Sequence, residues 1–197
     1  KRTFRVVVQG QAAHAGTSRR AERRDALVSA VAMVDALQRA IWDEADTVRF
    51  TIGMFSVEPN APSVVPARVT FSVDLRHDSD EVVRTLGDKV SVVCQSARGK
   101  CDVTVTPLLY DPPLEFPAAI RARVRDAAAR LGLSQQDLPS PAGHDSRYLH
   151  YFCPTGMLFI PCKGGISHSE DESITPSDAE AGVRVLADVA FELAGQA

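Results

Sequence analysis

Over residues 1–109, the apolar side chains alternate between the two-residue period of a β-strand and the three-to-four-residue period of an amphipathic helix. Four segments have the strand period and are rich in β-branched residues; they are residues 2–10, 47–59, 67–76 and 101–109. Two segments have the helix period; they are residues 25–42 and 80–97. This succession of periods predicts the element order β-α-β-β-α-β, and no other feature of the sequence constrains the fold as tightly.

The predicted order is that of the ferredoxin-like, or split βαβ, arrangement. It implies an α+β fold in which a four-stranded antiparallel sheet carries both helices on one face. In the second strand, alternation predicts one apolar side, made of Val48, Phe50, Ile52 and Met54. In the third strand, the corresponding side is made of Val69, Phe71, Val73 and Leu75. The short proline-rich link between these two strands predicts an antiparallel hairpin.

A proline-rich stretch, residues 110–117, interrupts this pattern and separates two predicted domains, residues 1–109 and residues 110–197. In the second domain, the sequence predicts a helix over residues 118–131, which a glycine ends. It also predicts one buried strand over residues 156–161, where an apolar run is bounded by glycine and proline.

The last predicted helix begins at Pro176, because proline is favoured at the first position of a helix. Its predicted apolar face consists of Ala179, Val183, Leu186, Val189, Ala190 and Leu193. A single buried strand cannot form a sheet, so residues 156–161 need partners that this sequence does not supply. We therefore expect residues 110–197 to be the C-terminal part of an α/β domain, and the sequence, which opens with Lys1, to be a fragment.

Charge, hydropathy and cysteine spacing exclude several classes of function. The net charge of −3 is too small to attract nucleic acid or an anionic membrane, so neither is an expected partner. No apolar run approaches the roughly 18 to 20 residues of a membrane-spanning helix. The four cysteines show neither a CxxC pair nor zinc-finger spacing, so we expect reduced, buried thiols in a cytoplasmic protein.

Three of the five histidines, His14, His144 and His168, lie in predicted loops among small residues that would let a ligand approach the imidazole. An ordinary hydrogen-bonded loop histidine would have the same neighbours, so the residues alone leave both interpretations open. The other two, His77 and His150, are interpreted as surface or packing residues.

Two further polar residues are candidates for substrate binding. Arg76 ends the third predicted strand, where its guanidinium could hold a carboxylate through two parallel hydrogen bonds. The alternative is a salt bridge to Asp74 or Asp78. Asn60 could donate to a substrate carbonyl, or it could simply favour a turn.

Four motifs resemble, in this order, those of zinc-dependent amidohydrolases of the M20 peptidase family. The motifs are "AHAGTSRRAERRDAL", "PNAPSVVPARVTFSVDLR", "SPAGHDS" and "GISHSEDE". The sequence is most similar to the hydantoinase/carbamoylase branch, which includes N-carbamoyl-L-amino-acid hydrolases and allantoate amidohydrolases. The resemblance covers essentially the whole sequence.

The resemblance implies a division of roles between the two predicted domains. Residues 1–109 would be a lid and dimerisation domain inserted into a metal-binding catalytic domain, of which residues 110–197 would be the C-terminal segment. His168 would be one ligand of a two-metal zinc site, in which Mn, Co or Ni could replace zinc. His14 would polarise the scissile carbonyl in the active site of the partner subunit of a homodimer.

The resemblance also implies how a small-molecule substrate would be held. Asn60 and Arg76 would bind it, with Arg76 taking its carboxylate. Ala142, Gly143 and His144 would line the pocket with backbone groups and an imidazole. The implied reaction is hydrolysis of the C–N bond of an N-carbamoyl amino acid or of a related ureido acid such as allantoate.

The sequence departs from the family pattern at Thr17-Ser18-Arg19, Ser63 and Pro141, which bear on substrate specificity. A larger departure is that only His168 is a good metal-ligand candidate, whereas catalytic zinc needs about three protein ligands. We therefore expect the chain alone to be inactive. Two alternatives are a non-catalytic dimerisation or binding module and another M20 enzyme, such as an aminoacylase or a desuccinylase.

Overall fold

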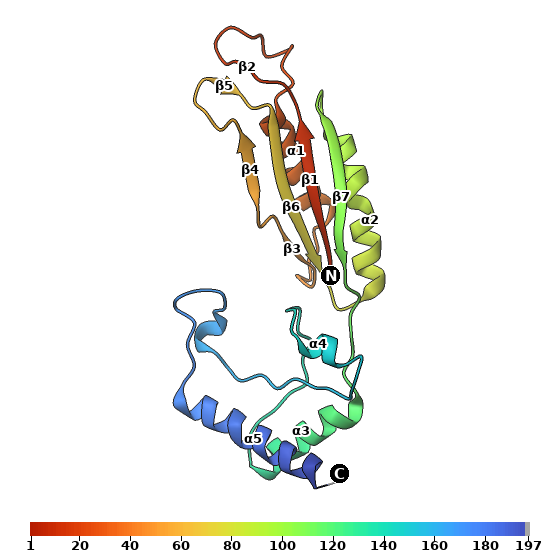
Figure 1. Cartoon of the computed structure of the whole chain (residues 1–197), viewed down its shortest axis with the longest axis vertical. Coiled ribbons are helices and arrows are strands. Elements are labelled where there is room, and N and C mark those ends of the chain that lie inside the picture. The colour runs from red at the N-terminus through yellow and green to blue at the C-terminus, as the bar shows by residue number, and fades with distance from the viewer. Residues whose placement is uncertain (196–197) are drawn as a thin grey trace. The chain divides into compact units, whose positions relative to one another are not determined.

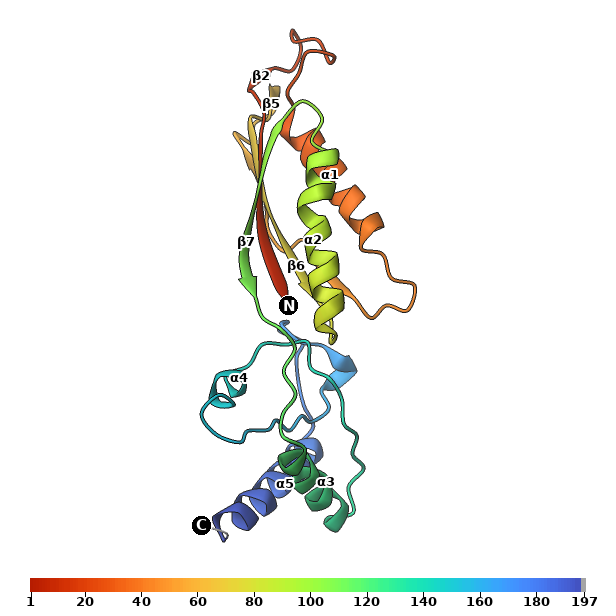
Figure 2. The same cartoon turned by 90° about the vertical axis from the view of Figure 1, so that its right-hand side faces the viewer.

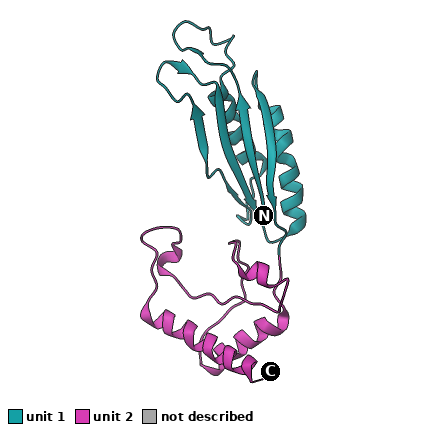
Figure 3. Ribbon diagram, viewed as in Figure 1, with its two compact units in different colours: residues 1–113 teal, residues 114–197 magenta. Residues whose placement is uncertain are grey.

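The structure, a computed structural model, describes residues 1–195 and contains both helices and a β-sheet. It divides into two compact units, Lys1–Pro113 and Leu114–Ala197 (Figure 3). Within the described residues, no helix combines the length and the apolar character needed to cross a bilayer.

Unit 1 is built on an antiparallel sheet whose central strand is β1 (Arg2–Gln9), as Figure 1 shows. On one side β1 pairs with β6 (Arg68–Arg76), and on the other side with β7 (Asp102–Tyr110). The outer edge beyond β6 is formed by two short strands, β3 (Arg49–Thr51) and β4 (Phe55–Glu58). The four predicted strand regions are therefore all strands, although the second one is divided.

Two helices, α1 (Ala26–Ala40) and α2 (Asp80–Ser96), cover the same face of this sheet (Figure 2). Each begins where a side chain accepts hydrogen bonds from main-chain N–H groups that have no partner inside the helix. Asp25 accepts from two such groups at the start of α1, and Ser79 accepts from one at the start of α2. The helix starts predicted from periodicity, residues 25 and 80, thus lie within one residue of the capping residues Asp25 and Ser79.

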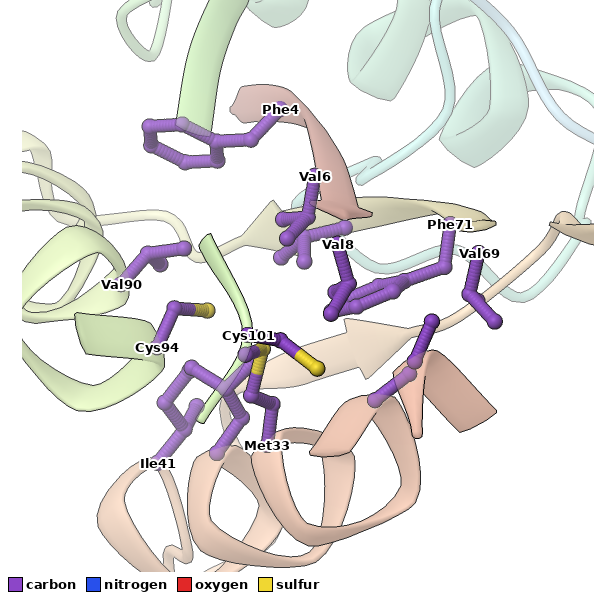
Figure 4. Packing of buried hydrophobic residues seen from close by; sticks show 14 of the residues in the cluster. Phe4, Val6, Val8, Met33, Ile41, Val69, Phe71, Val90, Cys94 and Cys101 are labelled. Atoms are coloured by element: carbon purple, nitrogen blue, oxygen red, sulfur yellow. The ribbon is translucent and has the colours of Figure 1, made fainter. Parts of the chain in front are cut away.

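The core of unit 1 lies between the sheet and the two helices (Figure 4). The predicted inward side of the third strand is confirmed, because Val69, Phe71, Val73 and Leu75 have no exposed surface. Burial also raises the pKa of the Cys94 thiol to about 11, so this cysteine behaves as a small apolar residue. The prediction of four buried cysteines is wrong in part, because Cys153 is exposed and Cys162 is half-buried.

The second predicted strand is interrupted between β3 and β4. Four residue steps lead from Thr51 to Phe55, but their partners on β6, Asp74 and Phe71, are only three steps apart. The extra residue makes a β-bulge, which exchanges the two faces of the strand. Phe55 therefore stacks on Phe71, and Met54, predicted to point inward, is 44% exposed.

A two-stranded ribbon lies where the sequence predicted only loops. β2 (Ala13–His14) pairs with β5 (Val64–Val65), each with two residues. Segments this short carry no measurable hydrophobic period, so the pattern could not reveal them.

Up to residue 195, unit 2 contains four helical segments. They are α3 (Ala118–Arg130), α4 (Ser146–Leu149), the 3₁₀ turn η1 (Lys163–Gly165) and α5 (Pro176–Ala194). Helix α5 begins as predicted, with Pro176 in its first turn and Thr175 as the capping residue. Its contact with α3 buries Ala127, Ala128, Val185 and Val189, and two ion pairs from Arg130 to α5 border that contact.

Two predictions for unit 2 are wrong. Residues 156–161 form neither strand nor helix, because a strand requires a neighbouring strand and the described part of the chain offers none there. The predicted apolar face of α5 is wrong in part: Val189 is buried as predicted, but Val183 and Leu186 are 65% and 61% exposed. Apolar residues occur on several sides of this helix, and the contact with α3 selects the side of Val185.

Glycine at position 10 is required by a close approach of two main-chain segments. A Cβ atom at Gly10 would lie 2.0 Å from the carbonyl oxygen of Arg24, whereas one at Gly53 would lie 3.9 Å from its nearest neighbour, Ser72 Oγ. We expect Gly10→Ala to lower the free energy of unfolding by about 1–3 kcal/mol, the usual effect of overpacking. The matched control, Gly53→Ala, should change it by less than about 1 kcal/mol. Urea unfolding of both variants measures the difference, and equal midpoints would contradict this account of Gly10.

Candidate functional site

The loop that carries His14 is organised by hydrogen bonds within the loop. The N–H and the hydroxyl of Ser18 both donate to the main-chain oxygen of His14, at 3.1 and 2.8 Å. The guanidinium of Arg23 donates to the carbonyl oxygens of Ala15 and Ser18. The N–H of Gly16 donates to His14 Nδ1 at 3.0 Å, while the side chain of His14 stays exposed.

The loop that carries Asn60 lies against the His14 loop. Strands β2 and β5 pair, and the N–H of Ala15 donates to the oxygen of Ser63 at 2.9 Å. Asn60 and Ser63 have positive φ angles of 52° and 65°, a conformation that asparagine tolerates better than most residues. The structure thus brings the two predicted site loops together at one end of unit 1 (Figure 1).

Arg76 lies at the other end of the same unit. It is the last residue of β6, and β6 runs antiparallel to β1, whose end leads to His14. The eight residue steps of β6 from Arg68 to Arg76 span about 26 Å at the usual rise of a strand. Within one chain, therefore, His14 and Arg76 cannot both contact one small substrate.

The guanidinium of Arg76 forms a bidentate salt bridge with Asp74, a neighbour on its own strand. Its Nε and Nη2 atoms donate to the two carboxylate oxygens of Asp74, at 2.7 and 2.8 Å. This hydrogen bonding raises the pKa of Arg76, which stays charged. Of the two salt bridges considered from the sequence, the one to Asp74 forms, while Asp78 approaches His77.

In unit 2, the segment Ala142, Gly143 and His144 is exposed and leads into α4. His144 Nδ1 lies 3.0 Å from the main-chain nitrogen of Ser146 and 2.8 Å from its hydroxyl. Ser146 is buried, and sequence reasoning overlooked it, although a serine two residues after a histidine was visible in "SPAGHDS".

His168 lies in a tight turn after η1. Its φ angle is +58°, and its main-chain N–H donates to the carboxylate of Glu172 at 3.0 Å. The side chain is exposed. Among the residues the structure describes, no group of three histidine, cysteine or acidic side chains is placed to hold a metal ion. His168 is therefore at most one ligand, and these residues do not by themselves fit a catalytic metal site.

The remaining histidines pack or bond within their own units. His77 Nδ1 accepts from the N–H of Ser79, and its Nε2 lies 3.2 Å from Thr47 Oγ1. His150 makes edge contacts with the rings of Phe116 and Tyr151.

Comparison with known proteins identifies the family. The model of "Peptidase family M20/M25/M40" matches residues 13–192. An N-carbamoyl-L-amino-acid amidohydrolase of Paenarthrobacter aurescens is 34% identical over 187 residues, covering 94% of this chain and 45% of that protein. An allantoate amidohydrolase of Bacillus subtilis (strain 168) is 30% identical over 200 residues, covering 98% and 48%.

The same relationship holds for solved structures. An amidase of the hydantoinase/carbamoylase family from Burkholderia vietnamiensis is 41% identical, has a TM-score of 0.87, and is matched over 95% of this chain and 46% of its own. The chain spans about half the length of the relatives it matches. The chain belongs to peptidase family M20/M25/M40, which confirms the resemblance expected from the four motifs.

The pairing of Asp74 with Arg76 leads to a test on unit 1. Asp74→Asn removes the charge that orients the guanidinium, but the pair is about one-third exposed, so the unfolding free energy should fall by only about 0.2–1 kcal/mol. The chemical shift of the Arg76 Nε–H group in ¹⁵N NMR should nevertheless change, because Nε loses the carboxylate to which it donates. Asp78→Asn is the control and should leave that signal unchanged. An unchanged signal in Asp74→Asn would show that other contacts orient Arg76.

Proposed function

We propose that this chain supplies substrate-binding and oxyanion-stabilising residues to a metal-dependent amidohydrolase that cleaves the C–N bond of an N-carbamoyl amino acid or a ureido acid such as allantoate. The observation that carries the proposal is its family membership, together with relatives named as N-carbamoyl-L-amino-acid and allantoate amidohydrolases. The free cysteines support the further proposal of a reducing, cytoplasmic compartment.

Unit 1 is proposed to be the ferredoxin-like lid and dimerisation domain, with residues 1–109 in this role and residues 110–197 forming a segment of the catalytic domain. The strand order β3-β6-β1-β7, with both helices on one face, is the order expected for a split βαβ unit. In this role the sheet is a rigid support that carries side chains at both of its ends.

The proposed substrate contacts follow from the chemistry of the side chains. Arg76 is permanently charged and planar, so it suits a carboxylate. His14 and Asn60 would stabilise the oxygen that becomes negative when water adds to the carbonyl carbon. Ala142, Gly143 and His144 would border the same substrate from the catalytic side.

The substrate is proposed to lie between two subunits. A carbamoyl amino acid is far shorter than the roughly 26 Å of strand that separates the two ends of the unit 1 sheet. If both His14 and Arg76 serve one substrate, they must come from different copies of the chain. A two-fold dimer would then contain two equivalent composite sites.

The surface beside α1 supports self-association in unit 1. Val28 and Val31 on this helix are 64% and 56% exposed. An open groove next to them is lined by Val31, Val34, Asp35, Gln38, Ile52 and Phe55. Strand β4 forms the adjacent edge of the sheet, and the described residues supply a neighbour on its β6 side alone. A second copy could cover the apolar groove and extend the sheet at this edge.

Zinc is the proposed metal, and His168 is its proposed ligand from this chain. M20 amidohydrolases are generally metal-dependent, but the described residues offer no complete set of ligands. When bound, the metal would supply a nucleophilic hydroxide at neutral pH. The same lack of a complete ligand set favours a second candidate function, a non-catalytic dimerisation or binding module that retains the lid.

Composite sites are tested by mixing two inactive variants in an enzyme of the relatives' length that carries this chain. His14→Ala and Arg76→Ala should each be nearly inactive, with Arg76→Ala losing about 2–5 kcal/mol of substrate binding. If the sites are shared, a heterodimer of the two variants has one intact site and one doubly damaged site. Hydrolysis of an N-carbamoyl amino acid should therefore reappear on mixing.

The matched control for this mixture is the double variant mixed with the unsubstituted enzyme. Shared sites predict that each site of this heterodimer has one lesion, whereas sites within one subunit leave one site intact. Failure of the two single variants to complement, with activity in the control heterodimer, would refute the composite site.

The metal proposal predicts weak zinc binding by the 197-residue chain alone, because one imidazole cannot build a tetrahedral site. Isothermal titration calorimetry should give weak binding that His168→Ala reduces further, and the chain should not hydrolyse carbamoyl substrates. His77→Ala is the control, because the ring of His77 already has hydrogen-bond partners within unit 1. Tight stoichiometric binding that depends on His168 would show that further ligands lie within the chain.

A further inference from the structure

Two histidines in different units share one local hydrogen-bond pattern. The main-chain N–H two residues after the histidine points to its Nδ1 atom, from Gly16 to His14 and from Ser146 to His144, both at 3.0 Å. A main-chain N–H can donate but cannot accept. Each Nδ1 must therefore be the unprotonated nitrogen of a neutral ring, and the proton must lie on Nε2.

We infer that the chain fixes His14 and His144 as Nε2–H tautomers, which makes both side chains hydrogen-bond donors. Gly16 and Ser146 are then positioning residues, because they act on the reaction only through the imidazoles they orient. A ring in this state has its one lone pair at Nδ1, which is already occupied. Neither histidine is therefore suited to ligate a metal through the nitrogen that it presents to solvent.

The identities of the two positioning residues agree with this role. A Cβ atom at position 16 would lie 3.2 Å from Cε1 and 3.4 Å from Nδ1 of His14, so glycine lets the donor approach without crowding the ring. Ser146 is buried, and its hydroxyl lies 2.8 Å from His144 Nδ1. Because that nitrogen carries no proton in this tautomer, the hydroxyl can only be a second donor, which shares the single lone pair with the main-chain N–H.

Two other histidines provide internal comparisons. His77 shares only part of the pattern: the N–H of Ser79 lies 2.9 Å from its Nδ1, but a carboxylate oxygen of Asp78 lies 3.0 Å from the same nitrogen. Its Nε2 lies 3.2 Å from Thr47 Oγ1. The Nδ1 of His77 therefore lies between a donor and an acceptor, so the main-chain N–H alone does not set the tautomer of this ring. For the ring of His168, the described residues provide no hydrogen bond to either nitrogen, so its tautomer is not fixed. The chain therefore separates two donor histidines from one histidine that can act as a ligand.

The role of these donors rests on the proposed function. During hydrolysis of a carbamoyl or ureido group, the carbonyl oxygen gains negative charge, and a neutral N–H aimed at it stabilises that charge. The donor needs no change of protonation during this step. His14 in unit 1 and His144 in unit 2 would each offer a neutral donor of this kind.

Long-range ¹H–¹⁵N NMR of the 197-residue chain tests the tautomers directly. Spectra are recorded at about pH 8.5, two pH units above the ordinary histidine pKa of about 6.5. His14 and His144 should each show one protonated Nε2 and one bare Nδ1, whereas His168 should show shifts averaged between the two tautomers. Single His→Gln variants assign the signals. A protonated Nδ1 at His14 or His144 would overturn the inference.

Two substitutions test the positioning residues. Gly16→Pro removes the donor to His14, so the His14 nitrogen shifts should move toward the averaged values of His168 while those of His144 stay unchanged. Ser146→Ala keeps the main-chain donor and removes only the hydroxyl. His144 should therefore keep its tautomer, and its nitrogen chemical shifts should move less than those of His14 do in Gly16→Pro. Circular dichroism checks the fold of each variant. Unchanged His14 shifts in folded Gly16→Pro would refute the role of Gly16.

A nickel titration needs no variant. Paramagnetic Ni²⁺ broadens the signals of a histidine that binds it, and His168 should broaden at a lower Ni²⁺ concentration than His14 or His144. Equal broadening of all three would refute the inference. If the tautomers are found but an enzyme of the relatives' length that carries this chain leaves carbamoyl substrates intact, the proposed function fails and the assignment of the tautomers stands.

Discussion

Strand β1 forms main-chain ladders with β6 on one side and β7 on the other, and the arrangement of unit 1 depends on these two pairings. Their register turns Phe4, Val6 and Val8 toward the two helices, and a slip of one residue would turn all three away from the core. Because β1 and β6 run in opposite directions, the same pairing also sends the His14 loop and Arg76 to opposite ends of the sheet. Core formation and the separation of the candidate residues thus have one cause.

Periodicity was sufficient to predict the fold where apolar residues alternate without interruption. The third strand is the clearest case, since its four inward residues are all completely buried. It was insufficient at Met54, because a bulge is set by pairing with β6 and leaves no mark in the apolar pattern. It also failed at Val183, because α5 has apolar residues on several sides and only tertiary contact with α3 selects one of them.

The sequence could propose the candidate site as a set of residues, but it could not predict the geometry of those residues. The motifs identified His14, Asn60 and Arg76, since small neighbours and a strand end are visible in the sequence. The distance between the ends of β6 and the pairing of Arg76 with Asp74 follow from strand direction and side-chain conformation. The bonds from main-chain N–H groups to His14 and His144 depend on local backbone angles, which residue identity alone does not determine.

The bulge between β3 and β4 has a consequence for how this protein avoids aggregation. It divides the outer edge of the sheet into pieces of three and four residues, each too short to template a long run of foreign strand. The added local twist also turns the two pieces out of a common plane. An edge of this kind can support a specific pairing of limited length, while open-ended stacking of strands into fibres finds no flat, continuous surface on which to grow.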